Sequence, residues 1–313
     1  MSEDDSDIKG PRETLALFGH EAAERALLDA YKSGRIAHAW LIGGPPGIGK
    51  ATLAFRFARF VLAHPDPLAA EVQAATSLAI DADHLVARRI AAQAQGDLRV
   101  LERVINEQTG KLYTNIRVDD VRRMVSFFAG TAGEGGWRIA IVDAVDDLAR
   151  EGANALLKVL EEPPARTLLL LISHSPGREL PTIRSRCRRL LLRPLEQEQV
   201  VHALAAATGR DAEEPELAAS AAASDGSVSR ALHALADALA GTDPQVLATF
   251  MDLVNGWLSQ RLGRGDGDAR NLARAAEVWD KVNRTARDVD AYNLERKPFV
   301  FSVFTELAAL GRA

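Results

Sequence analysis

The chain has 313 residues, of which 47% are hydrophobic and 26% are charged, and its net charge is −5 at pH 7. This length is enough for two or three domains, and the ordinary apolar content argues against a disordered chain. The negative charge balance argues against a protein whose whole surface binds nucleic acid, although it leaves room for a local basic patch.

The composition predicts a cytoplasmic protein that does not enter the membrane. Cys187 is the single cysteine, and a lone thiol forms neither an internal disulfide nor a cysteine-based zinc site. The segment 1–10 is acidic and polar, the opposite of a signal peptide. Even the longest apolar runs, such as 168–172, are much shorter than the ~20 residues that cross a bilayer.

The first part of the chain predicts a helix, a strand, a glycine-rich turn and a second helix. We expect residues 1–12 to form a solvated tail. Apolar residues at helical spacing predict a helix over 21–31, and Trp40–Ile42 has the character of a short buried strand. After the glycine-rich turn, apolar residues from Leu53 to Leu62 return to a period of 3.6, which predicts a helix that starts near Lys50.

Three further apolar runs predict strands in the middle of the chain, at 137–142 (WRIAIV), 167–173 (TLLLLIS) and 189–192 (RLLL). A helix over 154–160 lies between the first two. Strands that alternate with helices favour an α/β fold whose parallel sheet has helices on both sides. Between 64 and 118 we predict a helix near 86–94 and a loop or hairpin, and no function.

Beyond Pro194 the sequence becomes alanine-rich and helical, without strand signals. We therefore predict a nucleotide-binding domain over 13–194, a small helical domain over 195–242 and a second helical domain over 243–313.

The glycine-rich turn nearly matches the phosphate-binding pattern G-x-x-x-x-G-K-[ST], in the strand–loop–helix context that the pattern requires. Its backbone N–H groups can face phosphate oxygens, and Lys50 can supply a cation. The alternative is a glycine-rich turn with an incidental lysine. The predicted nucleotide-contacting residues of this loop are Gly44, Pro45, Pro46, Gly47, Ile48, Gly49, Lys50, Ala51 and Thr52.

Two groups that hydrolysis needs are missing from this predicted site. Ala51 stands where a hydroxyl would complete the Mg²⁺ shell, and Thr52 is rotated from that place by about 100°. Asp143 ends a strand, as a Mg²⁺-holding Walker-B acid does, but Ala144 replaces the carboxylate that orients water. We predict weak binding of ATP at most, with Mg²⁺ accompanying the nucleotide, and little hydrolysis.

Residues 153–187 read ANALLKVLEEPPARTLLLLISHSPGRELPTIRSRC. The N-A-L-L-K-x-L-E-E-P-P helix, the strand after it and the S-R-C motif closely resemble the clamp-loader branch of the AAA+ ATPases, and the resemblance extends over about 17–235. Because this chain keeps S-R-C but lacks catalytic parts of its own site, it is most similar to the delta-prime family of the bacterial DNA polymerase III clamp loader.

The resemblance implies a RecA-like AAA+ domain, a helical lid and an all-α carboxy-terminal collar that joins a pentameric ring. It also implies the role of a stator, which works with gamma/tau motor subunits and a delta subunit. The implied task is the ATP-driven loading of the sliding clamp onto primer–template DNA. The cysteine-bound zinc module of many such chains is missing, since 64–118 contains no cysteine.

Three residues outside the loop take implied roles from the family. Arg186, in S-R-C, is the expected arginine finger for a neighbouring subunit's ATP, a task that suits a forked, permanently charged guanidinium. Ser173 corresponds to a polar sensor, and Arg230 to a second sensor on the lid. The open alternatives are a solvated basic edge for Arg186, a satisfied surface hydroxyl for Ser173 and an ordinary helix-start arginine for Arg230.

Two other functions remain as alternatives: an active gamma/tau-type motor ATPase and a helicase-type AAA+ ring protein. Both need a competent ATP site, so Ala51 and Ala144 argue against them. The S-R-C and E-E-P-P motifs also argue against the helicase. Nothing in the sequence resembles a polymerase active site.

Overall fold

The computed structural model describes residues 10–106, 110–129, 136–175, 177, 181–240, 251, 254, 277–285 and 303. The predicted tail over 1–12 and the predicted collar over 243–313 lie largely outside these residues. The chain divides into two compact units, one of Pro11–Leu195 and one that includes Glu196–Ala313. We describe each unit by itself.

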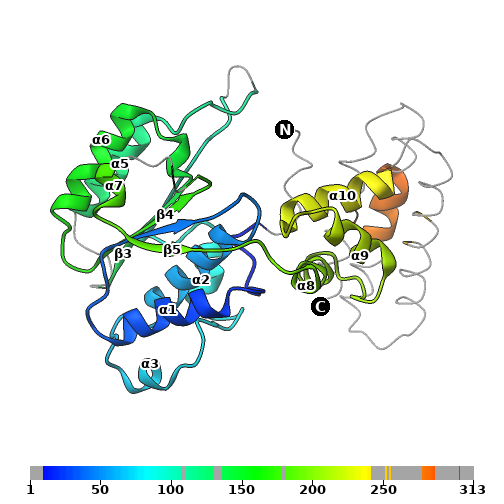
Figure 1. The fold of residues 1–313 in the computed structure, drawn as a ribbon, viewed down its shortest axis with the longest axis horizontal. Coiled ribbons are helices and arrows are strands. Elements are labelled where there is room, and N and C mark those ends of the chain that lie inside the picture. Colours follow the sequence, from blue (N-terminus) through cyan, green and yellow to red (C-terminus); the bar gives the residue numbers. More distant parts are fainter. Residues whose placement is uncertain are drawn as a thin grey trace. The chain divides into compact units, whose positions relative to one another are not determined.

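The first unit alternates helices and strands (Figure 1). In chain order its elements are α1 (Glu21–Lys32), β1 (Ala39–Gly43), α2 (Lys50–Ala63), α3 (Ala70–Ala74), α4 (Leu85–Ala91), β2 (Leu98–Glu102), α5 (Val118–Ala129), β3 (Arg138–Asp143), the 3₁₀ turn η2 (Val145–Asp147), α6 (Arg150–Glu161), β4 (Thr167–Ser173), α7 (Pro181–Arg184) and β5 (Arg188–Leu191). The predicted α/β fold is confirmed, and so are the four predicted strands, with ends that shift by a residue at most.

One strand was not predicted. The sequence LRVLE forms β2, in which only Leu98 and Leu101 are buried while Arg99 and Glu102 are exposed. Because β2 is an edge strand of the sheet, it lacks the continuous apolar run that marks the buried strands.

The five strands are parallel, in the order β2-β3-β4-β1-β5. Gly43, the last residue of β1, lies level with Ser173 of β4 and with Leu191 of β5. Asp143, the last residue of β3, lies level with Ile172. The carboxyl ends of these strands therefore form one edge, which is the usual ligand-binding edge of a parallel sheet.

Each face of the sheet is covered by its own helices (Figure 1). Leu168, Leu170 and Ile172 of β4 pack with α1, α2 and α4, whereas Leu169 and Leu171 pack with α5 and α6. This alternation follows from the two-residue period of a strand. The sheet is thus buried on both sides and forms a rigid base for its carboxyl edge.

The helix α2 is buried almost all around, and its one buried arginine, Arg59, is bonded to backbone carbonyl oxygens. Arg59 is only 1% exposed, and its NH2 group donates to the carbonyl oxygens of Arg12 at 2.7 Å and Thr14 at 3.0 Å. Burial lowers the pKa of Arg59 to about 10. These bonds hold the segment before α1 against the helix that carries the glycine-rich loop.

The second unit contains α8 (Gln197–Thr208), α9 (Pro215–Ala222) and α10 (Val228–Ala240). Glu196 and Gln199 cap the start of α8 reciprocally, and Gly209 ends it in the left-handed conformation. The described stretch 196–240 is therefore helical, as its alanine-rich sequence predicts. None of the helices in the described parts of the chain is long and apolar enough to cross a membrane.

Candidate functional site

The glycine-rich loop leaves β1 at the carboxyl edge of the sheet and leads directly into α2. Its base is fixed by two backbone bonds: Gly44 N donates to the Ser173 carbonyl at 3.2 Å, and Leu192 N donates to the Gly43 carbonyl at 2.8 Å. Gly44 has a φ of +151°, and a Cβ there would lie 2.6 Å from the Leu192 carbonyl oxygen. Only glycine fits this close approach.

The start of α2 offers amide groups to an anion. Gly49 precedes the helix with a φ of +97°, and no side chain caps it. The first intrahelical bond runs from Leu53 N to the Gly49 carbonyl at 3.0 Å. The amides of residues 50–52 come before it, and amides in this position suit a phosphate oxygen.

Lys50 is bound to its own loop. The ammonium donates to the Gly44 carbonyl at 2.7 Å and to the Pro45 carbonyl, and the residue is only 3% exposed. Burial lowers the pKa of Lys50 to about 8, against the opposing effect of Asp143 and Asp146. The lysine is still mostly charged at neutral pH, but a phosphate would compete with two carbonyl oxygens for it.

The two acidic residues near the loop differ in their roles. Asp146 accepts from His174 N at 2.7 Å and from Ser175 N at 3.0 Å, so it fixes the turn that follows β4. Asp143 ends β3 and is half-buried, and burial raises its pKa; nearby Glu102 adds to this rise while His174 and Lys50 oppose it. Asp143 is therefore the acid whose position at the strand end matches the predicted Walker-B residue.

Ser173 and His20 complete the surroundings of the loop. Ser173 is fully buried at the end of β4, and its Oγ accepts from Ser175 N at 3.1 Å. His20 was not among the predicted site residues; its Nε2 lies 2.6 Å from the Ile48 carbonyl oxygen. Burial lowers the pKa of His20, so the neutral ring donates this bond and supports the loop. Its only sequence signal was its place just before α1.

These residues fit phosphate better than they fit a metal ion. Lys50 and the uncapped helix start provide positive groups, whereas Ala51 provides no hydroxyl for Mg²⁺. Among the described residues, no group of three or more His, Cys, Asp or Glu side chains could hold a metal ion. Of the predicted site, Asp143 is the single acidic residue that could contribute to a nucleotide-bound Mg²⁺.

Arg186 lies in the turn between α7 and β5. Its NH1 donates to the Thr182 carbonyl at 2.9 Å and to Ser185 Oγ at 3.3 Å, while its NH2 lies 2.9 Å from Glu161 Oε1. The side chain is 34% exposed. Arg186 thus reaches the surface, but it contacts the end of α6 and not the loop of its own chain.

Arg230 belongs to the second unit. Its NH1 donates to Asp225 Oδ2 at 2.9 Å, and its backbone N donates to Ser227 Oγ at 3.3 Å at the start of α10. Its contact with a phosphate stays a prediction.

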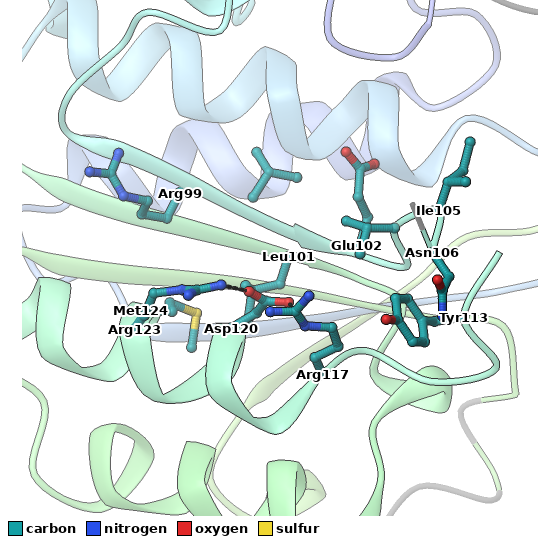
Figure 2. A pocket seen from close by; sticks show the side chains of 12 residues that line it. Arg99, Leu101, Glu102, Ile105, Asn106, Tyr113, Arg117, Asp120, Arg123 and Met124 are labelled. Atoms are coloured by element: carbon teal, nitrogen blue, oxygen red, sulfur yellow. Dashed lines mark hydrogen bonds and ion pairs between the residues drawn. The ribbon is translucent and has the colours of Figure 1, made fainter. Parts of the chain in front are cut away.

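A separate pocket of about 680 Å³ follows the edge strand β2 (Figure 2). Arg117, just before α5, and Arg123 on α5 both pair with Asp120, and Arg99 donates to the carbonyl of Leu98 at 3.1 Å. Since β3 and β4 separate β2 from β1, this pocket is distinct from the loop site. Its arginines already have partners, so we assign it no ligand.

A strand, a glycine-rich loop ending in a lysine and a helix, placed at the carboxyl edge of a parallel sheet, define a nucleotide-binding α/β domain of the P-loop class. The family described as "DNA polymerase III, delta subunit" matches residues 19–196. The chain belongs to this family.

The DNA polymerase III subunit delta' of Pseudomonas aeruginosa is 40% identical over 151 residues, which cover 48% of this chain and 42% of that protein. The DNA polymerase III subunit tau of Salmonella typhimurium is 30% identical over 279 residues, or 88% of this chain and 41% of the relative. The chain thus spans less than half the length of these relatives. A solved structure of the Thermotoga maritima RuvB Holliday junction branch migration motor has a TM-score of 0.45 and 18% identity, over 79% of this chain and 74% of the other.

Proposed function

We propose that this chain is a delta-prime-type stator subunit of a bacterial clamp loader. In this role it joins gamma/tau motor subunits and a delta subunit in a hetero-pentamer that loads the sliding clamp onto primer–template DNA with the energy of ATP. Membership of the delta family supports the proposal. The observation that carries it is the pairing of a phosphate loop that lacks the hydrolytic groups, at Ala51 and Ala144, with a surface arginine in the S-R-C motif.

At its own loop, the chain would hold a nucleotide without hydrolysing it efficiently. A nucleotide supplies phosphates for Lys50 and for the amides at the start of α2, with Asp143 beside them. No carboxylate at residue 144 orients a water molecule. Since phosphoryl transfer depends on positioning and on charge stabilisation, this loop would bind far better than it catalyses.

The catalytic contribution of the chain would come from Arg186, acting on ATP bound to a neighbouring motor subunit. A guanidinium can approach two phosphate oxygens at once and cannot lose its charge at physiological pH. Where arginine fingers are measured, they contribute about 10³ to 10⁵ in rate. We further propose that 195–242 acts as the lid, with Arg230 as its sensor, that 243–313 is the collar, and that the complex works in the cytoplasm.

The alternative function is that of an active gamma/tau-type motor, and the tau relative matches a larger share of this chain than the delta' relative does. ATP turnover by the isolated chain separates the two proposals. We expect no turnover above background, and a robust rate that disappears in Lys50→Ala would favour the motor.

Reconstitution with motor and delta subunits tests the in-trans arginine. We expect Arg186→Ala to lower hydrolysis at the neighbouring motor subunit's site by about 10³ to 10⁵, so the DNA-stimulated ATPase rate of the assembled complex should fall by the share that this one site contributes. Arg189→Ala is the matched control, because Arg189 is exposed on β5 only three residues away. An unchanged rate with Arg186→Ala in an assembled complex would refute the role of this residue.

A further inference from the structure

The two terminal nitrogens of Arg186 have partners of different kinds. NH1 donates to two neutral oxygens, the Thr182 carbonyl and Ser185 Oγ, within its own turn. NH2 contacts a charged group from another element, Glu161 Oε1, at 2.9 Å. One side of the guanidinium is thus tied to the turn that carries it, and the other side faces an anion.

The turn itself is firmly held. Ile183 is 1% exposed in the core beside α6, and Cys187 packs against the same core. Ser185 N donates to the Pro181 carbonyl at 2.9 Å, and Arg186 N to the Ile183 carbonyl at 3.1 Å. The base of Arg186 therefore has a fixed place, so the contact with Glu161 is not needed to order the backbone.

The position of Glu161 is unfavourable for its own helix. It is the last residue of α6, and a carboxylate at the negative end of a helix dipole is destabilising. The guanidinium of Arg186 neutralises it there. Glu162, the next residue, is also exposed, and it forms no ion pair with any residue that the structure describes.

The Arg186–Glu161 pair is easily broken. The two side chains are 34% and 50% exposed, and water and salt screen ion pairs of this kind. A phosphate carries more negative charge than a carboxylate and offers three oxygens, so it can displace Glu161 from NH2.

We propose that Glu161 is a positioning residue that holds Arg186 ready and must be displaced when the arginine meets the phosphates of a neighbouring subunit. The inference rests on the proposed in-trans role of Arg186. In the open assembly, the carboxylate occupies the NH2 group and its charge opposes the approach of another anion. When the subunits close on the clamp and DNA, phosphate replaces the carboxylate, and NH1 keeps its bonds to the turn. Glu161 thereby keeps the ATPase rate low until closure.

The test compares four complexes reconstituted with motor and delta subunits: wild type, Glu161→Gln, Glu162→Gln and Arg186→Ala. ATPase rates are measured alone and with sliding clamp plus primer–template DNA. We expect Glu161→Gln to raise the unstimulated rate about 1.5- to 5-fold, the equivalent of the 0.2–1 kcal/mol typical of an exposed ion pair. The ratio of the stimulated to the unstimulated rate falls by the same factor. Glu162→Gln, which removes a neighbouring charge of the same sign, leaves both rates unchanged.

A double variant shows whether Glu161 acts through Arg186. In the Arg186→Ala background, Glu161→Gln should have no effect on either rate. Glu161→Asp, which restores the charge on a shorter side chain, should return the unstimulated rate toward that of the wild type. Gel filtration of each complex, and thermal unfolding of each variant chain, separate these effects from a loss of assembly or folding. If Glu161→Gln fails to assemble, Glu161→Ala replaces it.

The outcomes are distinguishable. A large loss with Arg186→Ala together with an unchanged or lower unstimulated rate in Glu161→Gln overturns the holding role of Glu161 and leaves the arginine finger intact. An effect of Glu161→Gln that persists in the Arg186→Ala background overturns it as well. An unchanged rate in Arg186→Ala refutes the proposed in-trans role of Arg186 and the role of Glu161 with it, whereas the stator function itself is tested by the ATP turnover of the isolated chain.

Discussion

The burial of Lys50 should make anion binding at the loop depend on pH between about 7 and 9, below the range in which an ordinary lysine loses its charge. The pKa of Lys50 is about 8, instead of 10.5, because the ammonium is buried. A phosphate binds the charged form, so the affinity should fall as the pH rises from 7 through the pKa of Lys50. With this pKa, the charged fraction falls from about 90% at pH 7 to about 10% at pH 9, and the affinity should fall about tenfold.

The measurement is a titration of the isolated chain with ADP at pH 7 and pH 9, by calorimetry and by thermal shift. Lys50→Met should bind weakly at both pH values, and the tenfold difference should disappear. Lys158→Met is the matched control, because Lys158 is an exposed lysine on α6, away from the loop. Wild-type affinity in Lys50→Met would refute the assignment of this loop as the phosphate site, whereas equal wild-type affinities at the two pH values would refute the lowered pKa of Lys50.

Two further predictions concern the stability of the first unit. Burial raises the pKa of Asp143, so its ionised form opposes folding at pH 7. Asp143→Asn should therefore raise the melting temperature at pH 7. This gain should shrink as the pH falls through the raised pKa, because the aspartic acid then becomes neutral. A melting temperature that falls at pH 7 would contradict this. Gly44→Ala should lower the free energy of unfolding by about 2–4 kcal/mol, from the strained backbone and the 2.6 Å approach to the Leu192 carbonyl. The matched control is Gly96→Ala, which should change the free energy of unfolding in urea by less than about 0.5 kcal/mol, since nothing lies within 4 Å of a Cβ at Gly96. Equal losses in the two variants would show that the packing at Gly44 is not decisive.

The buried strands could be predicted because their apolar runs are continuous. TLLLLIS forms β4 over its whole length, and every residue in it is buried. The edge strand β2 could not be predicted, because only Leu98 and Leu101 are buried and the exposed, charged Arg99 and Glu102 interrupt the apolar pattern. Local periodicity reports burial, so a strand with one free edge gives a weak signal.

The candidate site also has a part that the sequence predicts and a part that it does not. The strand–loop–helix context around Lys50 follows from nearby residues and is confirmed. Contacts between residues far apart in the chain had no local signal: His20 supports Ile48 across 28 positions, and Arg186 meets Glu161 across the β4 strand. Those partners depend on the topology of the parallel sheet: Ile48 follows the carboxyl end of β1, whereas Glu161 and Arg186 come before the amino ends of β4 and β5, at the opposite edge.

The two cations on which the proposed function depends are both satisfied within the chain, but at different depths. Lys50 is buried and donates to two loop carbonyl oxygens, and moving the ammonium away would leave these two oxygens without that hydrogen-bond donor. Arg186 is paired at the surface with a carboxylate that water can solvate once it is released. An incoming phosphate therefore displaces the partner of Arg186 at lower cost than that of Lys50. This difference favours a chain that responds to a nucleotide held by its neighbour more readily than to one in its own loop.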